Sequence, residues 1–215
     1  MLVDLALKEK IALIIGSGAE VEIRARQLLA EYAKITVVTD RATAKDLGSS
    51  SMGRSLNIYP GGLARWRQAL KKTKQPFLVV ISTGDSTLDE EIAQNAHEVS
   101  KLVYVVDTPH LNDLNMTGVA KLGDIRVAVS TRGLSPAMAG VLRRKIESLI
   151  KPEDILQVRL QGEVRPALKK SIADPARRKK VVYKLIRDRQ ISSMLQSSKY
   201  EDARRRALSL IGEFR

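Results

Sequence analysis

The first half of the chain alternates short runs of apolar, often β-branched residues with longer stretches of helical periodicity. The short runs cover residues 11–15, 35–38, 56–59, 77–81 and 102–106. Apolar residues recur at helical spacing between them, over 21–32, 63–70 and 88–99. Strands that alternate with helices of this length form right-handed βαβ units and a parallel sheet. We therefore predict an α/β fold for this part of the chain.

The pattern changes after residue 107. Residues 119–122 and 125–129 have strand character and are joined by Gly123-Asp124, a hairpin signal. Ser135-Pro136 then opens a helix that reaches about residue 150, and beyond Pro152 the periodicity is helical throughout. We predict three parts: a nucleotide-binding domain (1–109), a strand–helix segment (110–150) and a basic helical domain (151–215). Two strands and one helix cannot cover both of their own faces, so we expect the middle segment to form a homodimer.

Composition narrows the possible partners. No apolar run approaches the roughly 20 residues of a membrane-spanning helix, and with no cysteine in the chain, disulfides and thiolate-bound metals are excluded. We expect a cytoplasmic protein with no membrane partner. Residues 151–215 hold 17 Lys and Arg against 8 Asp and Glu, a balance of +9 that favours an anionic partner. Two Phe and one Trp offer little aromatic surface for single-stranded nucleic acid, which disfavours that partner.

A glycine turn follows the first predicted strand. Gly16-x-Gly18 between a strand and a helix is the geometry that a dinucleotide pyrophosphate requires, and Asp40 follows the second strand, where a ribose would lie. A carboxylate there disfavours the 2′-phosphate of NADP, so we predict NAD, although the neighbouring Arg41 weakens this preference. Val21 replaces the third glycine of the motif. The alternative is that the two glycines only shape a turn in another doubly wound protein.

Thr83 follows the fourth predicted strand, where such sheets place a small polar residue facing the cofactor. The alternative is an ordinary threonine at a strand end. The two histidines of the chain cannot build a resident metal site without further ligands, and His110, between Asp107 and Asp113, is interpreted as a surface residue. We therefore predict no metal site.

Three segments, 5–26, 103–113 and 125–147, resemble the precorrin-2 dehydrogenase family, which includes the amino-terminal part of siroheme synthases. The most specific stretch is STRGLSPA at residues 130–137. The resemblance implies a Rossmann-type domain, an interleaved dimerisation segment and a helical domain. It also implies oxidation of precorrin-2 to sirohydrochlorin with NAD, and in some members insertion of ferrous iron to give siroheme. Tyr104 departs from the family, which commonly has asparagine there.

Several site residues follow from this resemblance. The pyrophosphate would contact Gly16, Gly18, Glu20 and Val21, and the ribose Asp40. Asp107 matches the acidic residue proposed as the base, and Ser135 matches a serine near the tetrapyrrole. Asp107 could instead cap backbone N–H groups in the turn 107–109. The two functional alternatives are a bifunctional dehydrogenase and ferrochelatase, and a non-catalytic NAD-sensing module with a nucleic-acid-binding tail.

The substrate carries many carboxylates, so a basic lining is the expected complement. Arg132 and Arg143, on either side of the start of the helix at Ser135, are the predicted substrate-binding cations. The basic run Arg177–Lys180 is interpreted instead as a solvated helix face.

Overall fold

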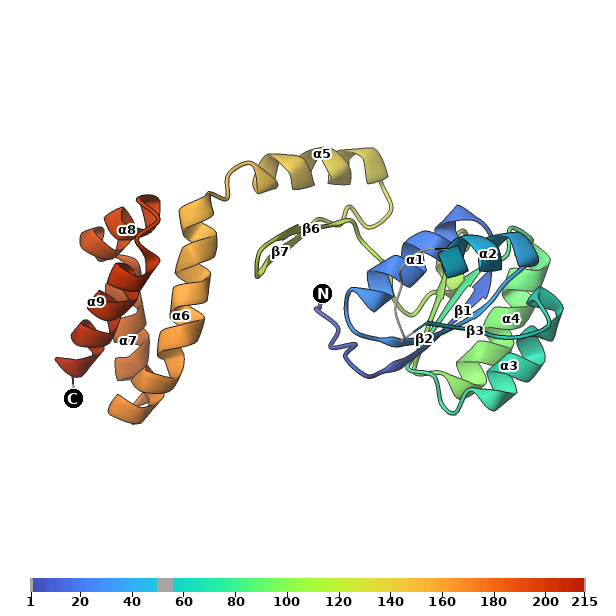
Figure 1. Cartoon of the computed structure of the whole chain (residues 1–215). Coiled ribbons are helices and arrows are strands. Elements are labelled where there is room, and N and C mark those ends of the chain that lie inside the picture. Colours follow the sequence, from blue (N-terminus) through green and yellow to red (C-terminus); the bar gives the residue numbers. More distant parts are fainter. Residues whose placement is uncertain (1, 50–55, 215) are drawn as a thin grey trace. The chain divides into compact units, whose positions relative to one another are not determined.

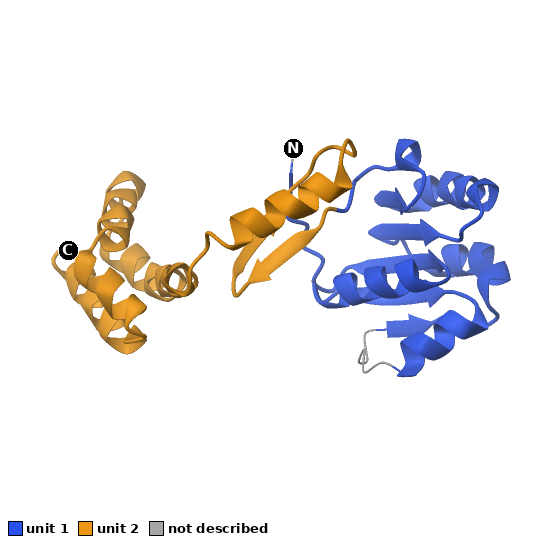
Figure 2. Ribbon diagram, turned by 90° about the horizontal axis from the view of Figure 1, so that it is seen from above, with its two compact units in different colours: residues 1–116 blue, residues 117–215 orange. Residues whose placement is uncertain are grey.

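The computed structural model describes residues 2–49 and 56–214, which fold as two compact units, Met1–Met116 and Thr117–Arg215 (Figure 2). The segment after β5 packs with the first unit, because Leu111 contacts one of its cores and Leu114 and Met116 contact the other. The three-part division at 109 and 150 remains a prediction.

The first unit is built on one five-stranded parallel sheet in the order β3-β2-β1-β4-β5. Its strands are β1 (Ile11–Gly16), β2 (Lys34–Val38), β3 (Leu56–Ile58), β4 (Leu78–Ser82) and β5 (Leu102–Val105). Every predicted strand of this half is present, and all neighbours pair in parallel. The Rossmann-type α/β fold is confirmed.

Helices cover both faces of this sheet (Figure 1). On one face α1 (Ala19–Leu29) and α2 (Arg41–Ser49) bury Val21, Leu28 and Leu47. On the other, α3 (Trp66–Lys72), which follows a 3₁₀ turn at Leu63–Arg65, and α4 (Ser86–Val99) bury Trp66, Ile92 and Ala96. The helix α2 is not among the predicted elements, because it buries only Thr43 and Leu47 and so shows little apolar periodicity.

The second unit begins with the predicted hairpin. The strands β6 (Val119–Leu122) and β7 (Ile125–Ala128) pair antiparallel around Gly123-Asp124. The helix α5 (Pro136–Glu147) packs on both strands, with Pro136 in its first turn as expected.

The rest of the second unit is helical, as predicted: α6 (Pro152–Ser171), α7 (Pro175–Ile186), α8 (Arg189–Gln196) and α9 (Tyr200–Gly212). These helices share one apolar core that includes Leu160, Leu185, Ile191 and Ile211. Asp174 and Asp188 begin α7 and α8 by accepting hydrogen bonds from first-turn N–H groups. Over residues 2–49 and 56–214, no helix is long and apolar enough to span a bilayer.

Candidate functional site

The strand order places a topological switch point between β1 and β4. From the ends of these adjacent strands the chain passes to opposite faces of the sheet, into α1 after β1 and into α4 after β4. In open α/β sheets, ligands bind in the crevice outside the carboxyl ends of strands at such a point. The predicted cofactor residues lie at this edge of the sheet.

At Gly16 the backbone of β1 lies against the backbone of β4 with no room for a side chain. Gly16 pairs with Ser82 of β4, and a β-carbon at Gly16 would lie 2.0 Å from the Ser82 carbonyl oxygen. The same oxygen accepts a hydrogen bond from the Ser17 N–H at 3.0 Å. Only glycine fits this position, since any side chain would separate β1 from β4.

Gly18 has a different requirement. It begins α1 with φ +80°, and a β-carbon there would meet no described heavy atom within 4 Å. The described part of the chain supplies no side-chain cap to α1. The first-turn N–H groups of α1, those of Glu20 and Val21 among them, therefore have no side-chain acceptor in the described structure, as binding of a pyrophosphate needs. The Val21 side chain is fully buried in the core, so only its backbone can meet a cofactor.

Asp40 and Thr43 connect the end of β2 to this turn. One Asp40 carboxylate oxygen accepts a hydrogen bond from the Thr43 N–H at 2.8 Å, and this bond lowers the pKa of the Asp40 carboxyl. The Thr43 hydroxyl in turn accepts from the Gly18 N–H at 2.8 Å. Asp40 thus begins α2 and fixes the predicted ribose position to the phosphate turn, while Arg41 is exposed beside it. Thr43 is not among the predicted site residues. The sequence signal that could have identified it is its position three residues after Asp40, a spacing typical of a helix start.

Thr83 uses its hydroxyl inside the protein. It donates to Asp89 of α4 at 2.7 Å, and the Thr83 N–H donates to the same oxygen at 3.0 Å. Asp89 is 2% exposed and is the one buried acidic residue of the described chain. The pair anchors the turn after β4, which is consistent with the alternative of an ordinary strand-end threonine; the cofactor contact remains a prediction.

Asp107 follows the end of β5 and is exposed. The outward N–H groups of this edge strand are satisfied by other side chains: Asp113 accepts from Val103 at 2.8 Å and Asn112 from Val105 at 2.5 Å. Within the described residues, no hydrogen bond occupies the Asp107 carboxylate. Asn112 and Asp113 thus cap N–H groups of β5 and not of the turn 107–109, and the Asp107 oxygens stay available.

A partly buried cluster of Glu20, Arg24 and Tyr104 lies near enough to Asp107 for its charge to act on Tyr104. Arg24 of α1 contacts Glu20 at 2.9 Å, and its guanidinium carbon lies 5.5 Å from the centre of the Tyr104 ring. Burial raises the pKa of the Tyr104 hydroxyl, with the Glu20 and Asp107 charges acting in the same direction. Because the Glu20 carboxylate is paired with Arg24, contact of Glu20 with a pyrophosphate would come from its backbone N–H.

The predicted substrate residues lie in the second unit. The Ser135 hydroxyl accepts from the Met138 N–H at 3.3 Å and begins α5. Arg132 adopts a left-handed backbone conformation with φ +54°, held by a hydrogen bond from its N–H to the Ser130 hydroxyl. Arg143 pairs with Glu147 at 3.3 Å. The structure thus brings together the predicted cofactor residues of the first unit, whereas the convergence of Asp107 with Ser135 remains a prediction.

Across residues 2–49 and 56–214 no three His, Asp or Glu side chains gather in a way that could hold an ion. His110 lies exposed in the 3₁₀ turn at Pro109–Leu111.

Comparison with known proteins identifies the first unit. A protein-family model described as "Putative NAD(P)-binding" matches residues 3–117. The chain belongs to this family. The matched region contains β1 to β5 with the whole phosphate turn, so the predicted nicotinamide dinucleotide-binding domain is confirmed.

Named relatives extend the likeness beyond this domain. A precorrin-2 dehydrogenase of Methanosarcina barkeri is 34% identical over 138 residues, which cover 64% of this chain and 60% of the relative. A siroheme synthase of Salmonella paratyphi A is 29% identical over 186 residues, covering 81% of this chain and 37% of the relative. The solved structure of SirC, a precorrin-2 dehydrogenase, matches with TM-score 0.72 at 19% identity, covering 100% of both chains. These matches confirm the predicted family resemblance, and the last confirms the fold.

Proposed function

We propose that this protein oxidises precorrin-2 to sirohydrochlorin with NAD as hydride acceptor. The observation that carries the proposal is the open turn at Gly18, joined through Thr43 to the Asp40 carboxylate, in a chain similar to precorrin-2 dehydrogenases. This arrangement fits a dinucleotide: it offers unfilled space and free N–H groups to the pyrophosphate, and a carboxylate to the ribose.

The choice of NAD over NADP rests on Asp40. A second phosphate on the ribose would meet its negative charge, and the hydrogen bond from Thr43 keeps this carboxyl ionised by lowering its pKa. The next residue, Arg41, is a cation that could offset part of the repulsion between Asp40 and a 2′-phosphate. We expect the repulsion to dominate, because Asp40 is fixed by its hydrogen bond to α2.

The oxidation removes one hydride and one proton from the macrocycle. NAD, when bound, supplies the acceptor for the hydride, and the protein must position the reacting carbon and accept the proton. We assign the proton to Asp107, an exposed carboxylate at the carboxyl end of β5 without a hydrogen bond in the described chain. Ser135, Arg132 and Arg143 would hold substrate carboxylates. For Arg143 this requires sharing its guanidinium with Glu147.

The direct test is anaerobic incubation of the purified protein with precorrin-2 and NAD, followed by absorbance of NADH and of sirohydrochlorin. Formation of both in equal amounts supports the proposal. Retention of NAD binding without turnover would leave a cofactor-binding module and overturn the dehydrogenase.

The similarity to siroheme synthases favours a second candidate, a chain that also inserts ferrous iron into sirohydrochlorin. Iron would be a substrate here and would not need a resident site. Addition of ferrous iron to the completed first reaction tests it: siroheme forms faster than in protein-free solution if the chain is also a chelatase.

We further propose that the protein is a homodimer in the cytoplasm. Within the described chain, no residue of α5 is buried, and apolar side chains lie exposed on and beside it: Leu134, Met138, Val141, Leu142, Ile146 and Leu149. An exposed apolar surface of this kind is typical of an association site, and a second copy of the chain supplies the same surface. The lack of cysteine fits a reducing compartment.

A further inference from the structure

The helical part of the second unit contains a groove outside the predicted site. Its volume is about 580 Å³, and its lining comes from α7, from the residue before it, and from the end of the chain: Asp174, Ala176, Arg177, Lys180, Val181, Lys184 and Phe214. Ligand pockets for small molecules typically measure about 300–1,000 Å³. The groove is therefore large enough for one such molecule.

The cations of the groove are not neutralised by neighbouring acids. Arg177, Lys180 and Lys184 follow each other at three- and four-residue spacing, so they share one face of α7, and all three are exposed. In the described structure no side-chain nitrogen of these three residues lies within 4.0 Å of a carboxylate. Asp174, the one acidic residue of the lining, accepts hydrogen bonds from the N–H groups of Ala176 and Arg177 and so serves the start of α7.

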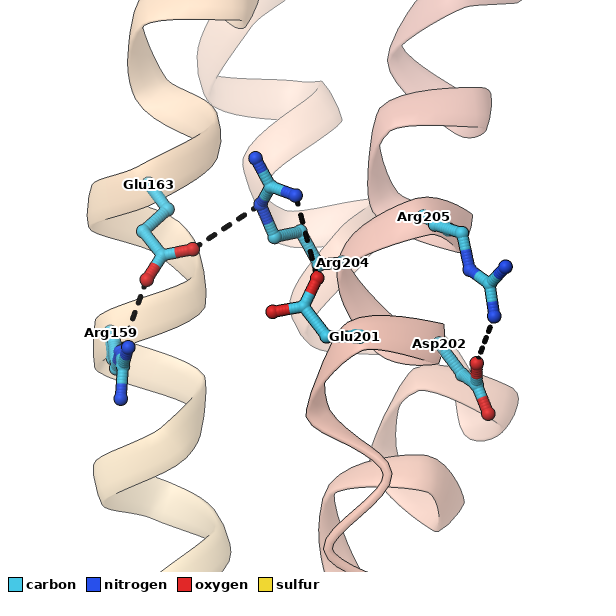
Figure 3. Close-up of polar contacts among 6 residues, drawn as sticks. All are labelled: Arg159, Glu163, Glu201, Asp202, Arg204 and Arg205. Atoms are coloured by element: carbon cyan, nitrogen blue, oxygen red, sulfur yellow. Dashed lines mark hydrogen bonds and ion pairs between the residues drawn. The ribbon is translucent and has the colours of Figure 1, made fainter.

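Several basic residues of the neighbouring helices are paired with acids. Arg204 of α9 lies 3.3 Å from Glu163 of α6, which also accepts from Arg159 at 3.0 Å (Figure 3). Arg206 pairs with Asp188 at 2.7 Å. These basic residues of α6 and α9 are thus paired with acids, whereas the three cations of the groove are not. An unbalanced face that is also hollow differs from the solvated helix face predicted for Arg177–Lys180.

The groove also has apolar walls. Val181 is 2% exposed, and the Lys184 ammonium lies 4.6 Å from the centre of the Phe214 ring. A flat ligand could stack on this ring while its acidic groups meet the lysines. Single-stranded nucleic acid stacks successive bases on several aromatic residues, but Phe214 is the one aromatic residue of the lining. Cations around an apolar wall favour a planar molecule with carboxylates on its rim.

We propose that this groove binds a polycarboxylated tetrapyrrole, at a site separate from the dehydrogenase site. The choice of a tetrapyrrole rests on the proposed function; the planar, polyanionic character of the ligand follows from the groove itself. Lys180 and Lys184 would pair with carboxylates, and the macrocycle would lie against Phe214. Such a site would retain the released macrocycle for a metal-inserting enzyme that consumes it.

The experiment counts binding sites with uroporphyrin, a planar octacarboxylate whose fluorescence reports binding. Three proteins are titrated at equal ionic strength: the unmodified chain, the double variant Lys180→Glu/Lys184→Glu and the control Lys169→Glu/Lys170→Glu. The control makes the same charge change on exposed lysines in the last turn of α6, outside the groove. Circular dichroism verifies that each variant is folded.

We call Lys180→Glu/Lys184→Glu the groove variant. We expect it to bind one equivalent of uroporphyrin per chain fewer than the unmodified chain and the control. Phe214→Ala should weaken that equivalent about tenfold, the loss of one stacking contact. Equal stoichiometry in the unmodified chain, the groove variant and the control overturns the proposal. It is also overturned if a short single-stranded oligonucleotide displaces the extra equivalent of uroporphyrin at a lower concentration than mellitate, a polycarboxylate, does. The groove variant should oxidise precorrin-2 at the unmodified rate. If none of the proteins oxidises precorrin-2 but the unmodified chain still binds the extra equivalent of uroporphyrin, the proposed function is wrong and the proposed groove site is supported.

Discussion

A β-carbon placed on Gly16 would lie 2.0 Å from the carbonyl oxygen of Ser82, well inside van der Waals contact. The contact joins β1 to β4, the two strands between which the crevice opens. Gly18, two residues later, has open space where a side chain would be. Two glycines of one motif therefore have separable roles, one in the sheet and one in front of the ligand.

This separation predicts opposite outcomes for two alanine variants. Gly16→Ala should destabilise the first unit by at least the roughly 1–3 kcal/mol of backbone strain, because β1 and β4 must also move apart. Gly18→Ala should cost only about 1–2 kcal/mol for its left-handed backbone, yet weaken NAD binding strongly, since the methyl group occupies the pyrophosphate approach. Thermal unfolding and NAD titration measure the two effects. A stable Gly16→Ala protein would contradict the close contact.

Asp40 predicts the cofactor preference. The unmodified chain should bind NAD more tightly than NADP, and Asp40→Ala should weaken NAD binding about tenfold or more through loss of a charge-assisted hydrogen bond of about 1.5–3 kcal/mol. Asp40→Ala also removes the cap of α2, at a cost of about 1 kcal/mol. Asp40→Asn is the control, since it keeps an oxygen for Thr43 but removes the charge. Both variants should narrow the difference between NAD and NADP, and equal affinities in the unmodified chain would refute the assignment.

Local sequence signals predict some of these structural elements and not others. The apolar runs predict the strands, and Ser135-Pro136 and Asp174-Pro175 predict the starts of α5 and α7, because each signal is local. The helix α2 buries only Thr43 and Leu47, so no run of apolar residues at helical spacing follows Asp40 to identify it as a helix start. The contact of Arg24 with Tyr104 joins α1 to β5 and depends on strand order, which short-range patterns do not determine.

The pair of Asp188 with Arg206 predicts acid sensitivity in the helical part. Arg206 donates to both carboxylate oxygens, at 2.9 and 2.7 Å, and lowers the pKa of Asp188 from 3.8 to about 2. The folded pKa lies below the unfolded one, so this stabilisation is complete above about pH 4 and is lost as the pH falls toward 2. The Gln190 and Ile191 N–H groups at the start of α8 also lower this pKa, so the contribution of the pair is below the roughly 2 kcal/mol of the whole shift. Unfolding followed by circular dichroism should show a smaller acid-induced loss of stability in Asp188→Asn than in the unmodified chain; equal losses would exclude the pair as the cause.

The exposed face of α5 predicts the association state. Leu142→Glu/Ile146→Glu would place two charges in the proposed interface and should convert a dimer to monomers at micromolar concentration. Arg144→Glu is the control, because it makes the same net charge change of −2 at an exposed residue of the same helix outside the apolar face. Sedimentation velocity distinguishes the species. A monomeric unmodified chain would contradict the proposed homodimer.

Asp107 predicts the chemical step. If this carboxylate takes the proton, Asp107→Asn should lower precorrin-2 turnover about 10²–10⁴-fold, the usual contribution of a positioned base, with NAD affinity unchanged because the residue lies outside the phosphate turn. Ser135→Ala should have a milder effect, on substrate affinity, since the hydrogen bond of a neutral hydroxyl contributes about 0.5–1.5 kcal/mol to binding. It should also lower the free energy of unfolding by about 1 kcal/mol, because Ser135 caps α5. Single-turnover and steady-state kinetics separate the two effects. Full activity of Asp107→Asn would assign the proton to solvent, leaving the dehydrogenase in place without Asp107 as its base.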